Sequence, residues 1–245
     1  MTEDAAWGER ASSLHLWWEL DPEEALVQVE ATLEVLEGPR VPALYFWALQ
    51  ASFRDGRRVR GGGHLDLQSA GQDPPLRFVN WGGYRAADDG GSELEGTASE
   101  LPSAVDNPNT RDYPWAVRRP YRLRIGRSPD GPGSWRGEVT DLGSSRPTVV
   151  RDLRCPSRHL TDAVVWSEVF ARCDDPSVTV RWSELVAVTS AGRRVPVTTV
   201  VATYQRRQDG GCDNTTAAVD GTGWLQRTNV RRQVAPGARL SLLDG

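Results

Sequence analysis

Strict alternation of apolar and polar residues is the feature that most limits how this chain can fold. In eleven separate segments the apolar side chains occupy every second position, and clusters of Gly, Pro, Asp and Ser separate the segments. The segments are 14–20, 25–36, 43–53, 63–68, 76–81, 121–125, 135–142, 164–171, 178–188, 195–204 and 223–232. Because successive side chains of a β-strand point to opposite faces, each segment can bury one face. The sequence therefore predicts an antiparallel all-β protein.

One segment also offers a helical pattern. Asp21 resembles a helix N-cap, and Pro22 suits the first turn of a helix that would run to residue 36. Against this, apolar residues alternate strictly with polar ones from Val27 to Val35. We therefore predict a strand over 25–36, preceded by a turn at 21–24.

The chain is expected to form a single domain over residues 1–245. β-Sandwiches of this length are routinely one domain, and the 24 glycines and 16 prolines are spread along the chain instead of forming a linker. Segment 86–112 is the exception, because it is long and irregular. We expect it to be either a functional loop folded over the sheet or a mobile flap.

Charge and hydropathy exclude two classes of partner. The 29 basic residues, all arginine, face 33 acidic ones, and the formal net charge of −4 does not favour binding to nucleic acid. No run approaches about 18 uninterrupted apolar residues, so no membrane-spanning helix is expected. The acidic N-terminus lacks the features of a signal peptide, which predicts a cytoplasmic chain as written, or an extracellular one if an export signal was removed.

Neither the cysteines nor the glycines form a recognised cofactor motif. Cys155, Cys173 and Cys212 lack the C-x-x-C spacing of a zinc site, so no metal is expected. We expect three buried free thiols, with a Cys173–Cys212 disulfide as the alternative in an oxidising compartment. No P-loop and no dinucleotide-binding glycine motif occurs, so no cofactor is expected either.

The opening segment sorts into two faces. Leu14, Leu16 and Trp18 share one face, which we expect to be buried, whereas His15, Trp17 and Glu19 share the other. An aromatic ring beside a carboxylate and an imidazole is the combination that binds a sugar, because the ring stacks on its C–H face and the polar groups bond its hydroxyls. Trp17 is therefore the candidate for ligand binding, and Trp18 for the core.

Two further strands carry polar groups on one face. The inward face of the first of these strands carries Leu65 and Leu67, and its other face carries His64, Asp66 and Gln68. Such a polar face is either a ligand site or a solvent-exposed surface of the sheet. Glu168 shares its face with the apolar Val164, Trp166 and Phe170. A carboxylate in apolar surroundings needs a partner, for which one of the many arginines is the candidate, or its pKa rises. The sequence is consistent with either of two roles for Glu168, a structural ion pair or catalysis.

Taken in order, the motifs resemble an uncharacterised bacterial and fungal domain family. Its opening histidine, leucine and tryptophan match His15, Leu16 and Trp17. Its glycine-rich strand ending in glutamine, followed by a strand with tryptophan, matches Gln68 and Trp81. Further matches are Trp115, Tyr121 and, loosely, Ser167 with Glu168, so the resemblance spans roughly residues 14–195.

That family often occurs in exported proteins beside carbohydrate-related modules. The resemblance therefore implies a β-sandwich of the concanavalin or jelly-roll kind with a connection to carbohydrates. This chain departs from the family in its missing export signal and its own C-terminal segment 210–232. Those two departures from the family count against a secreted role for this chain.

Two functions are consistent with these residues. The first is binding of a glycan or other small molecule, motivated by the ten tryptophans. Its candidate stacking surfaces are Trp17, Trp81, Tyr84 and Trp115, and its polar contacts are His15, Glu19, Asp66 and Gln68. The second is an enzyme, either a glycoside hydrolase or lyase or a tailoring enzyme for a bulky apolar metabolite, with Glu168, Asp66 and His15 as acid or base groups in an aromatic-lined pocket. A protein-binding scaffold is a third, simpler possibility.

Overall fold

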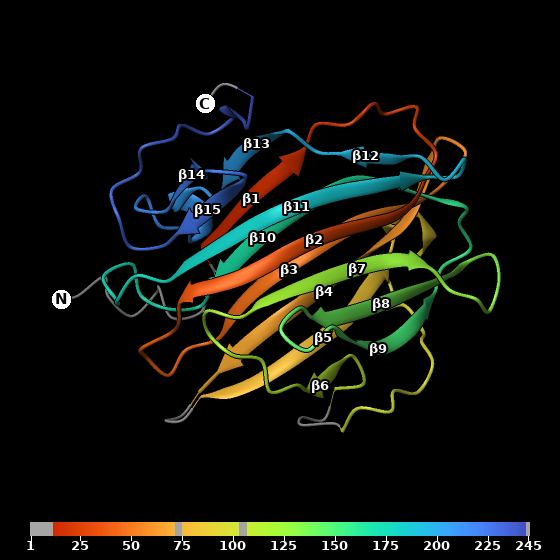
Figure 1. Cartoon of the computed structure of the whole chain (residues 1–245), viewed down its shortest axis with the longest axis horizontal. Helices are drawn as coiled ribbons and strands as arrows, with labels where there is room; N and C mark the ends of the chain where they lie inside the picture. Colours follow the sequence, from red (N-terminus) through yellow and green to blue (C-terminus); the bar gives the residue numbers. More distant parts are fainter. Residues whose placement is uncertain (1–11, 72–74, 103–106, 244–245) are drawn as a thin grey trace.

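The computed structural model describes residues 12–71, 75–102 and 107–243 (Figure 1). The acidic N-terminal residues 1–11, on which the expected cellular location partly rests, lie outside this range. The strands are β1 (Ser12–Trp18), β2 (Leu26–Glu37), β3 (Tyr45–Asp55), β4 (Arg58–Ala70), β5 (Leu76–Arg85), β6 (Thr110–Asp112), β7 (Pro120–Arg127), β8 (Ser134–Asp141), β9 (Arg146–Arg154), β10 (His159–Val169), β11 (Thr179–Thr189), β12 (Arg194–Pro196), β13 (Thr199–Tyr204), β14 (Thr216–Asp220), β15 (Gly223–Arg227) and β16 (Arg239–Ser241).

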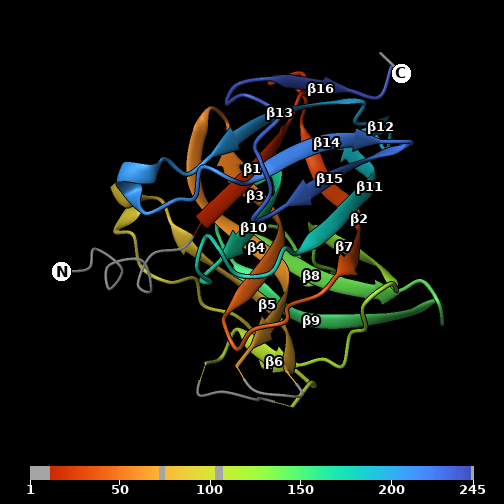
Figure 2. The same cartoon turned by 90° about the vertical axis from the view of Figure 1, so that its left-hand side faces the viewer.

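Antiparallel pairing arranges these strands in two layers. The β1 layer runs in the order β16, β13, β1, β10, β3, β4, β5, β6. The β2 layer runs in the order β14, β15, β11, β2, β7, β8, β9, with β12 also on β11. Among the named strands, one pairing, Leu160 with Leu26, joins the layers. In Figure 2, β3 and β4 lie to the left of β2 and β11. The predicted antiparallel β-sandwich is confirmed.

Aromatic rings fill the space between the layers. Phe53 on β3 stacks on Trp135 on β8, with ring centroids 5.3 Å apart. Trp81 on β5 lies beside them, and its Nε1 donates to the Trp135 carbonyl at 3.3 Å. A Cβ at Gly137 would come within 2.5 Å of the Trp81 ring, so β8 must carry glycine there. Close packing of large rings in the core thus fixes how β5 and β8 face each other.

The strand prediction for 25–36 is confirmed, because β2 spans Leu26–Glu37 after a turn at residues 22–23. Its alternating Val29, Ala31, Leu33 and Val35 are all buried. Strands β6, β9, β14 and β16 were not among the predicted segments. In β9, Pro147 and the consecutive Val149 and Val150 interrupt the alternation, and a register shift against β8 accompanies that interruption.

The cysteines require a correction. Cys173 and Cys212 form a disulfide, and Cys155 is a buried free thiol. The expectation of three free thiols is therefore wrong, and the alternative pairing is the one that forms. The bond ties the β10–β11 loop to the loop that precedes β14. Sequence spacing could not decide this, because the two cysteines are 39 residues apart and meet only when β1, β10 and β13 assemble.

The long segment 86–112 is hydrogen-bonded to β5 through Ser92, Leu94 and β6, and to β9 through residues 95–97. It contains the short 3₁₀ turn η3 (Ala87–Asp89) and strand β6. The backbone of Thr97 donates to Asp152, and Arg154 donates to Glu95, each at 2.8 Å. The segment therefore covers an otherwise open sheet edge and joins the two layers there. No helix in the described part of the chain has the length and apolar character needed to cross a membrane.

Candidate functional site

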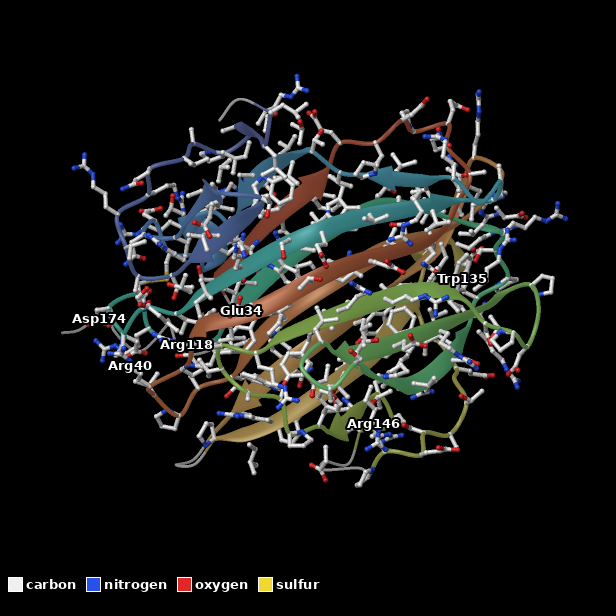
Figure 3. The ribbon with its side chains drawn as sticks, in the orientation of Figure 1. Glu34, Arg40, Arg118, Trp135, Arg146 and Asp174 are labelled. Carbon is white, nitrogen blue, oxygen red and sulfur yellow. A yellow bond between two sulfur atoms is a disulfide. The ribbon has the colours of Figure 1, made fainter. Side chains whose placement is uncertain are left out.

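The outer faces of the two layers differ in chemistry. The face of the β2 layer turns toward the viewer in Figure 3 and carries charged side chains, including the labelled Glu34 and Arg118. Many of its charges are paired across strands, as where Glu30 on β2 meets Arg194 of β12 at 3.1 Å. The opposite outer face, on the β1 layer, combines aromatic rings, amides, imidazoles and two carboxyl groups. This face is the candidate site.

Strand register brings the predicted polar residues into two adjacent rows on that face. Asp66 pairs with Ala48, Ala48 with Trp166, and Trp166 with His15. Gln68 pairs with Phe46, and Phe46 pairs with Glu168. His15, Asp66, Gln68 and Glu168, which come from three strands, thus share one face. Alternation places each side chain on this face, whereas the order β1, β10, β3, β4 brings them together.

A pocket of about 360 Å³ opens over β3, β4 and β5. Its polar lining comes from His64, Gln68, Asn80, Glu93, Asn107, Asn109 and Thr110. Phe46, Phe78 and Tyr84 supply aromatic surface. Of these, Tyr84 is the most open to solvent, with 59% of its surface exposed. The pocket therefore offers several hydrogen-bonding side chains beside aromatic rings.

Asp66 lies beneath the polar lining and has no exposed surface. Asn80 donates Nδ2 to its Oδ2 at 3.0 Å, while Oδ1 has no hydrogen-bond partner among the described residues. Burial raises the pKa of Asp66 to about 8, which outweighs the opposite effect of the Gln68 and Asn80 amides. The nearby Glu168 carboxylate raises it further. Asp66 is therefore protonated at neutral pH.

His64 lies between Asp66 and the pocket. Its Nε2 is 3.6 Å from Asp66 Oδ2, and 29% of its side chain is exposed. Burial lowers the pKa of His64 to about 4, so the imidazole is neutral at pH 7. The indole of Trp166 packs between His64 and His15, at centroid distances of 5.7 and 6.1 Å. Trp166 is itself fixed by donation from Nε1 to Gln50 at 3.0 Å.

Glu168 is partnered by a hydroxyl. Ser13 on β1 donates Oγ to its Oε1 at 3.0 Å, which replaces the arginine considered from the sequence. Burial raises the pKa of Glu168, and the Ser13 hydrogen bond only partly opposes this. Burial also lowers the pKa of His15. Neither Glu168 nor His15 lines the pocket, so two of the three catalytic candidates lie beside it and the third, Asp66, lies beneath it.

The two adjacent tryptophans lie on opposite faces, as alternation predicted. Trp18 is 8% exposed and belongs to the main core, whereas Trp17 is half-buried on the outer face. Trp17 donates Nε1 to Thr203 on β13 at 3.0 Å, stacks on His15 and packs against the small cluster of Ala48, Val164 and Trp166, away from the pocket lining. Glu19, beyond the end of β1, is held by Arg239 of β16 and does not line the pocket.

Two proposed stacking surfaces need correction. Trp81 is 0% and Trp115 is 1% exposed, so neither ring can stack on a ligand. Trp81 fills the core, and Trp115 packs edge-on against Trp47 while donating Nε1 to the Gln68 carbonyl at 2.9 Å. Local alternation cannot show that a second layer covers these rings. Of the predicted ligand contacts, Gln68 and Tyr84 do line the pocket.

Sequence reasoning missed several pocket residues. Phe46, Phe78 and Asn80 were not named as contacts, although extending the alternation of Gln68 and Asp66 across β3 and β5 would have found them. Asn109 has no such signal, because it belongs to segment 86–112. Among the described residues, no cluster of three or more His, Cys, Asp or Glu side chains suits a metal ion.

Asn109 forms one wall of the pocket, and hydrogen bonds from residues outside the pocket fix its position. Arg151 on β9 donates Nη1 to Asn109 Oδ1 at 2.9 Å and to the Pro108 carbonyl at 2.7 Å. Asn109 also donates to Glu93, and its side chain fills the space over Gly82, where a Cβ would approach to 2.9 Å. A glycine in β5 thus gives the loop room to reach the sheet.

Comparisons with known proteins found similarity only among solved structures. No family model matches the chain, and no curated protein matches it. Scytalido-glutamic peptidase, in complex with a peptide-based transition state analogue, is similar over 90% of this chain and 98% of its own, with 11% identity and a TM-score of 0.46. SCP-B, a member of the eqolisin family of peptidases, gives the same coverage and identity with a TM-score of 0.47. The alginate lyase Aly36B gives 8% identity and a TM-score of 0.28, with 84% of this chain and 68% of its own covered.

Proposed function

We propose that this protein binds a carbohydrate in the pocket over β3, β4 and β5. The single observation that carries the proposal is the lining of this pocket: an imidazole and several side-chain amides stand beside aromatic rings. Amides both donate and accept hydrogen bonds, as a ring of hydroxyl groups requires, while aromatic faces suit the C–H face of a sugar. The resemblance to a family found beside carbohydrate-related modules supports the same substrate class.

Each part of the pocket has a role in this proposal. Tyr84 offers the exposed ring on which a sugar stacks. Gln68 and Asn80 supply polar atoms on the sheet, and Asn109 supplies them from the facing wall. Because Arg151 fixes Asn109 and strand pairing fixes the other two, these groups are largely ordered before a ligand arrives. Such preorganisation lowers the entropic cost of binding.

Binding is favoured over catalysis by the position of the carboxyl groups. Asp66 has no exposed surface and Glu168 does not line the pocket, so Glu93, which accepts from Asn109, is the only carboxyl in the described lining. A general acid or base must come within hydrogen-bonding reach of the bond it acts on. The carboxyls of Asp66 and Glu168 do not converge on the pocket as a glycosidase pair would.

One observation keeps acid or base catalysis as a second candidate function. Burial raises the pKa of both Asp66 and Glu168, and the two groups interact. Groups with raised pKa values that interact on one face are typical of acid catalysts. In this alternative Glu168 and His15 act on a glycan that lies across Trp166, and the buried Asp66 acts only through its interaction with Glu168. Release of reducing ends or unsaturated products from a polysaccharide panel, abolished by Glu168→Gln, would establish it.

The binding proposal is tested by a glycan array followed by titration calorimetry at pH 6. We expect Tyr84→Ala to raise the dissociation constant about tenfold, equivalent to about 1.4 kcal/mol for a lost stacking contact. Val219→Ala is the matched control, because Val219 is an exposed apolar residue on β14 of the other layer. Trp17→Phe should also leave affinity unchanged. Absence of binding to any glycan, or equal losses in Tyr84→Ala and Val219→Ala, would refute the proposal.

We also infer that the protein works in an oxidising compartment. The Cys173–Cys212 disulfide supports an extracellular location, because such bonds persist outside the reducing cytosol. Mass spectrometry of the protein from its native source, alkylated before reduction, tests this. Alkylation of Cys173 and Cys212 before reduction would contradict it.

A further inference from the structure

The pocket contains an imidazole backed by a buried carboxyl group. His64 lines the pocket, and Asp66, two residues further along β4, lies on the same face beneath it. The distance between His64 Nε2 and Asp66 Oδ2 is 3.6 Å. An acid group behind an imidazole fixes which ring nitrogen carries the proton. Asp66 therefore lies close enough to His64 to influence the orientation of its ring.

Hydrogen bonding around Asp66 selects the tautomer of His64. Asp66 Oδ2 accepts from Asn80 Nδ2 at 3.0 Å, so this oxygen faces donors. Asn80 is fixed in turn, because its Oδ1 accepts from Thr110 at 3.2 Å. The carboxyl proton of Asp66 is then on Oδ1, which has no hydrogen-bond partner among the described residues, and Oδ2 stays an acceptor toward which an Nε2–H of His64 would point from 3.6 Å. Nδ1 is then unprotonated and is left as a hydrogen-bond acceptor for a ligand.

The charges around His64 come from four elements. Asp66 lies on β4 itself, Glu168 on β10, His15 on β1 beyond Trp166, and Glu93 on the loop after β5. The strands directly beside His64 place Gln50 and Gly82 opposite it, and neither is charged. No arginine lines this pocket within the described residues. At neutral pH the described lining therefore offers no positive charge for an anionic sugar.

We propose that Asp66 is a positioning residue that holds His64 as an uncharged acceptor for a hydroxyl of a neutral saccharide. This inference rests on the proposed carbohydrate binding and deepens it by naming the ligand class and the residue that contacts it. Asp66 itself, enclosed beneath the lining, does not touch the ligand. Its role differs from the catalytic role considered from the sequence.

The positioning role makes binding depend on pH. A bound saccharide replaces the water in the pocket above Asp66 and so lowers the polarity around this buried group, which makes it bind preferentially to the form with a protonated carboxyl. The pKa of Asp66 is raised by burial to about 8. At pH 9 roughly one molecule in ten keeps that proton, so the apparent affinity falls about tenfold from its value at pH 6. Below the pKa of His64, protonation removes the acceptor and weakens binding as well.

The experiment compares three variants of the full chain by calorimetry, with the best glycan from the array, between pH 5 and pH 9. Asp66→Asn mimics the protonated carboxyl, so we expect affinity within about threefold of the wild type at pH 6 and no tenfold loss at pH 9. His64→Gln should bind about tenfold more weakly at pH 6. His159→Gln, at the start of β10, is the matched control and should bind like the wild type.

A second measurement does not depend on any ligand. Nitrogen-15 shifts of the His64 ring should report a neutral imidazole with the proton on Nε2, and Asp66→Ala should change this tautomer population. An Nδ1–H tautomer overturns the positioning role. Retention of the wild-type pH profile in Asp66→Asn overturns it too. If the wild type binds no glycan, the proposed function fails together with the ligand role of His64, while the tautomer measurement still decides whether Asp66 orients the ring.

Discussion

Replacing Asp66 by asparagine should make the protein more stable, by an amount that grows with pH. In the folded protein burial raises the pKa of Asp66 to about 8, whereas in the unfolded chain this carboxyl ionises near pH 3.9. Between these two pH values folding takes up a proton. The contribution of Asp66 to stability is therefore complete below about pH 4 and is lost progressively as the pH rises to 8.

His64 has the opposite effect in the wild type. Its pKa is lowered by burial to about 4 in the folded state, against about 6.5 when unfolded, so folding releases a proton between these values. The contribution of His64 to the free energy of unfolding therefore rises between about pH 4 and 6.5. Over the same range the contribution of Asp66 falls. In the wild type the two effects cancel up to about pH 6.5. The loss due to Asp66 then stands alone between about pH 6.5 and 8.

The difference between Asp66→Asn and the wild type isolates the carboxyl group. It should increase by about 1.4 kcal/mol per pH unit, or about 3 kcal/mol between pH 5 and 7.5. Urea unfolding followed by tryptophan fluorescence at several pH values measures it, and Asp88→Asn, at an exposed position in η3, serves as the control. A difference that stays constant with pH would show that Asp66 ionises normally in the folded protein and would refute the reasoning.

Two further predictions concern the packing of the layers and the disulfide. Gly137→Ala should destabilise the protein by about 1–3 kcal/mol, because the new Cβ overlaps the Trp81 ring, whereas Gly62→Ala, with no neighbour closer than 3.5 Å, is the control in urea unfolding. Equal stability of the two variants would contradict the packing described. Removing the disulfide with Cys173→Ser and Cys212→Ser together should lower the free energy of unfolding by about 2–4 kcal/mol. An unchanged melting temperature on adding a reductant to the wild type would argue against this contribution.

Much of the fold and part of the candidate site could be predicted from sequence. Alternation assigned β2 correctly against a competing helical pattern, and it placed Trp17 and Trp18 on opposite faces. It also placed Asp66 and Gln68 on one face of β4. These results depend on local geometry, because the direction of a side chain in a strand follows from its position along that strand alone.

The tertiary structure decided which strands are neighbours and which surfaces are covered. The second layer buries Trp81 against Trp135, and the neighbouring strands β3 and β5 place Phe46 and Asn80 beside the polar residues of β4. Asn109 is held at the pocket by Arg151, by Glu93 and by the backbone of Trp81, all of them distant from it in sequence. Side-chain alternation is fixed within a few residues, whereas pairing partners, burial and raised or lowered pKa values depend on contacts between segments distant in sequence. The sequence by itself therefore determined the strands and their faces, and the packing of the two layers decided which of those faces forms a pocket.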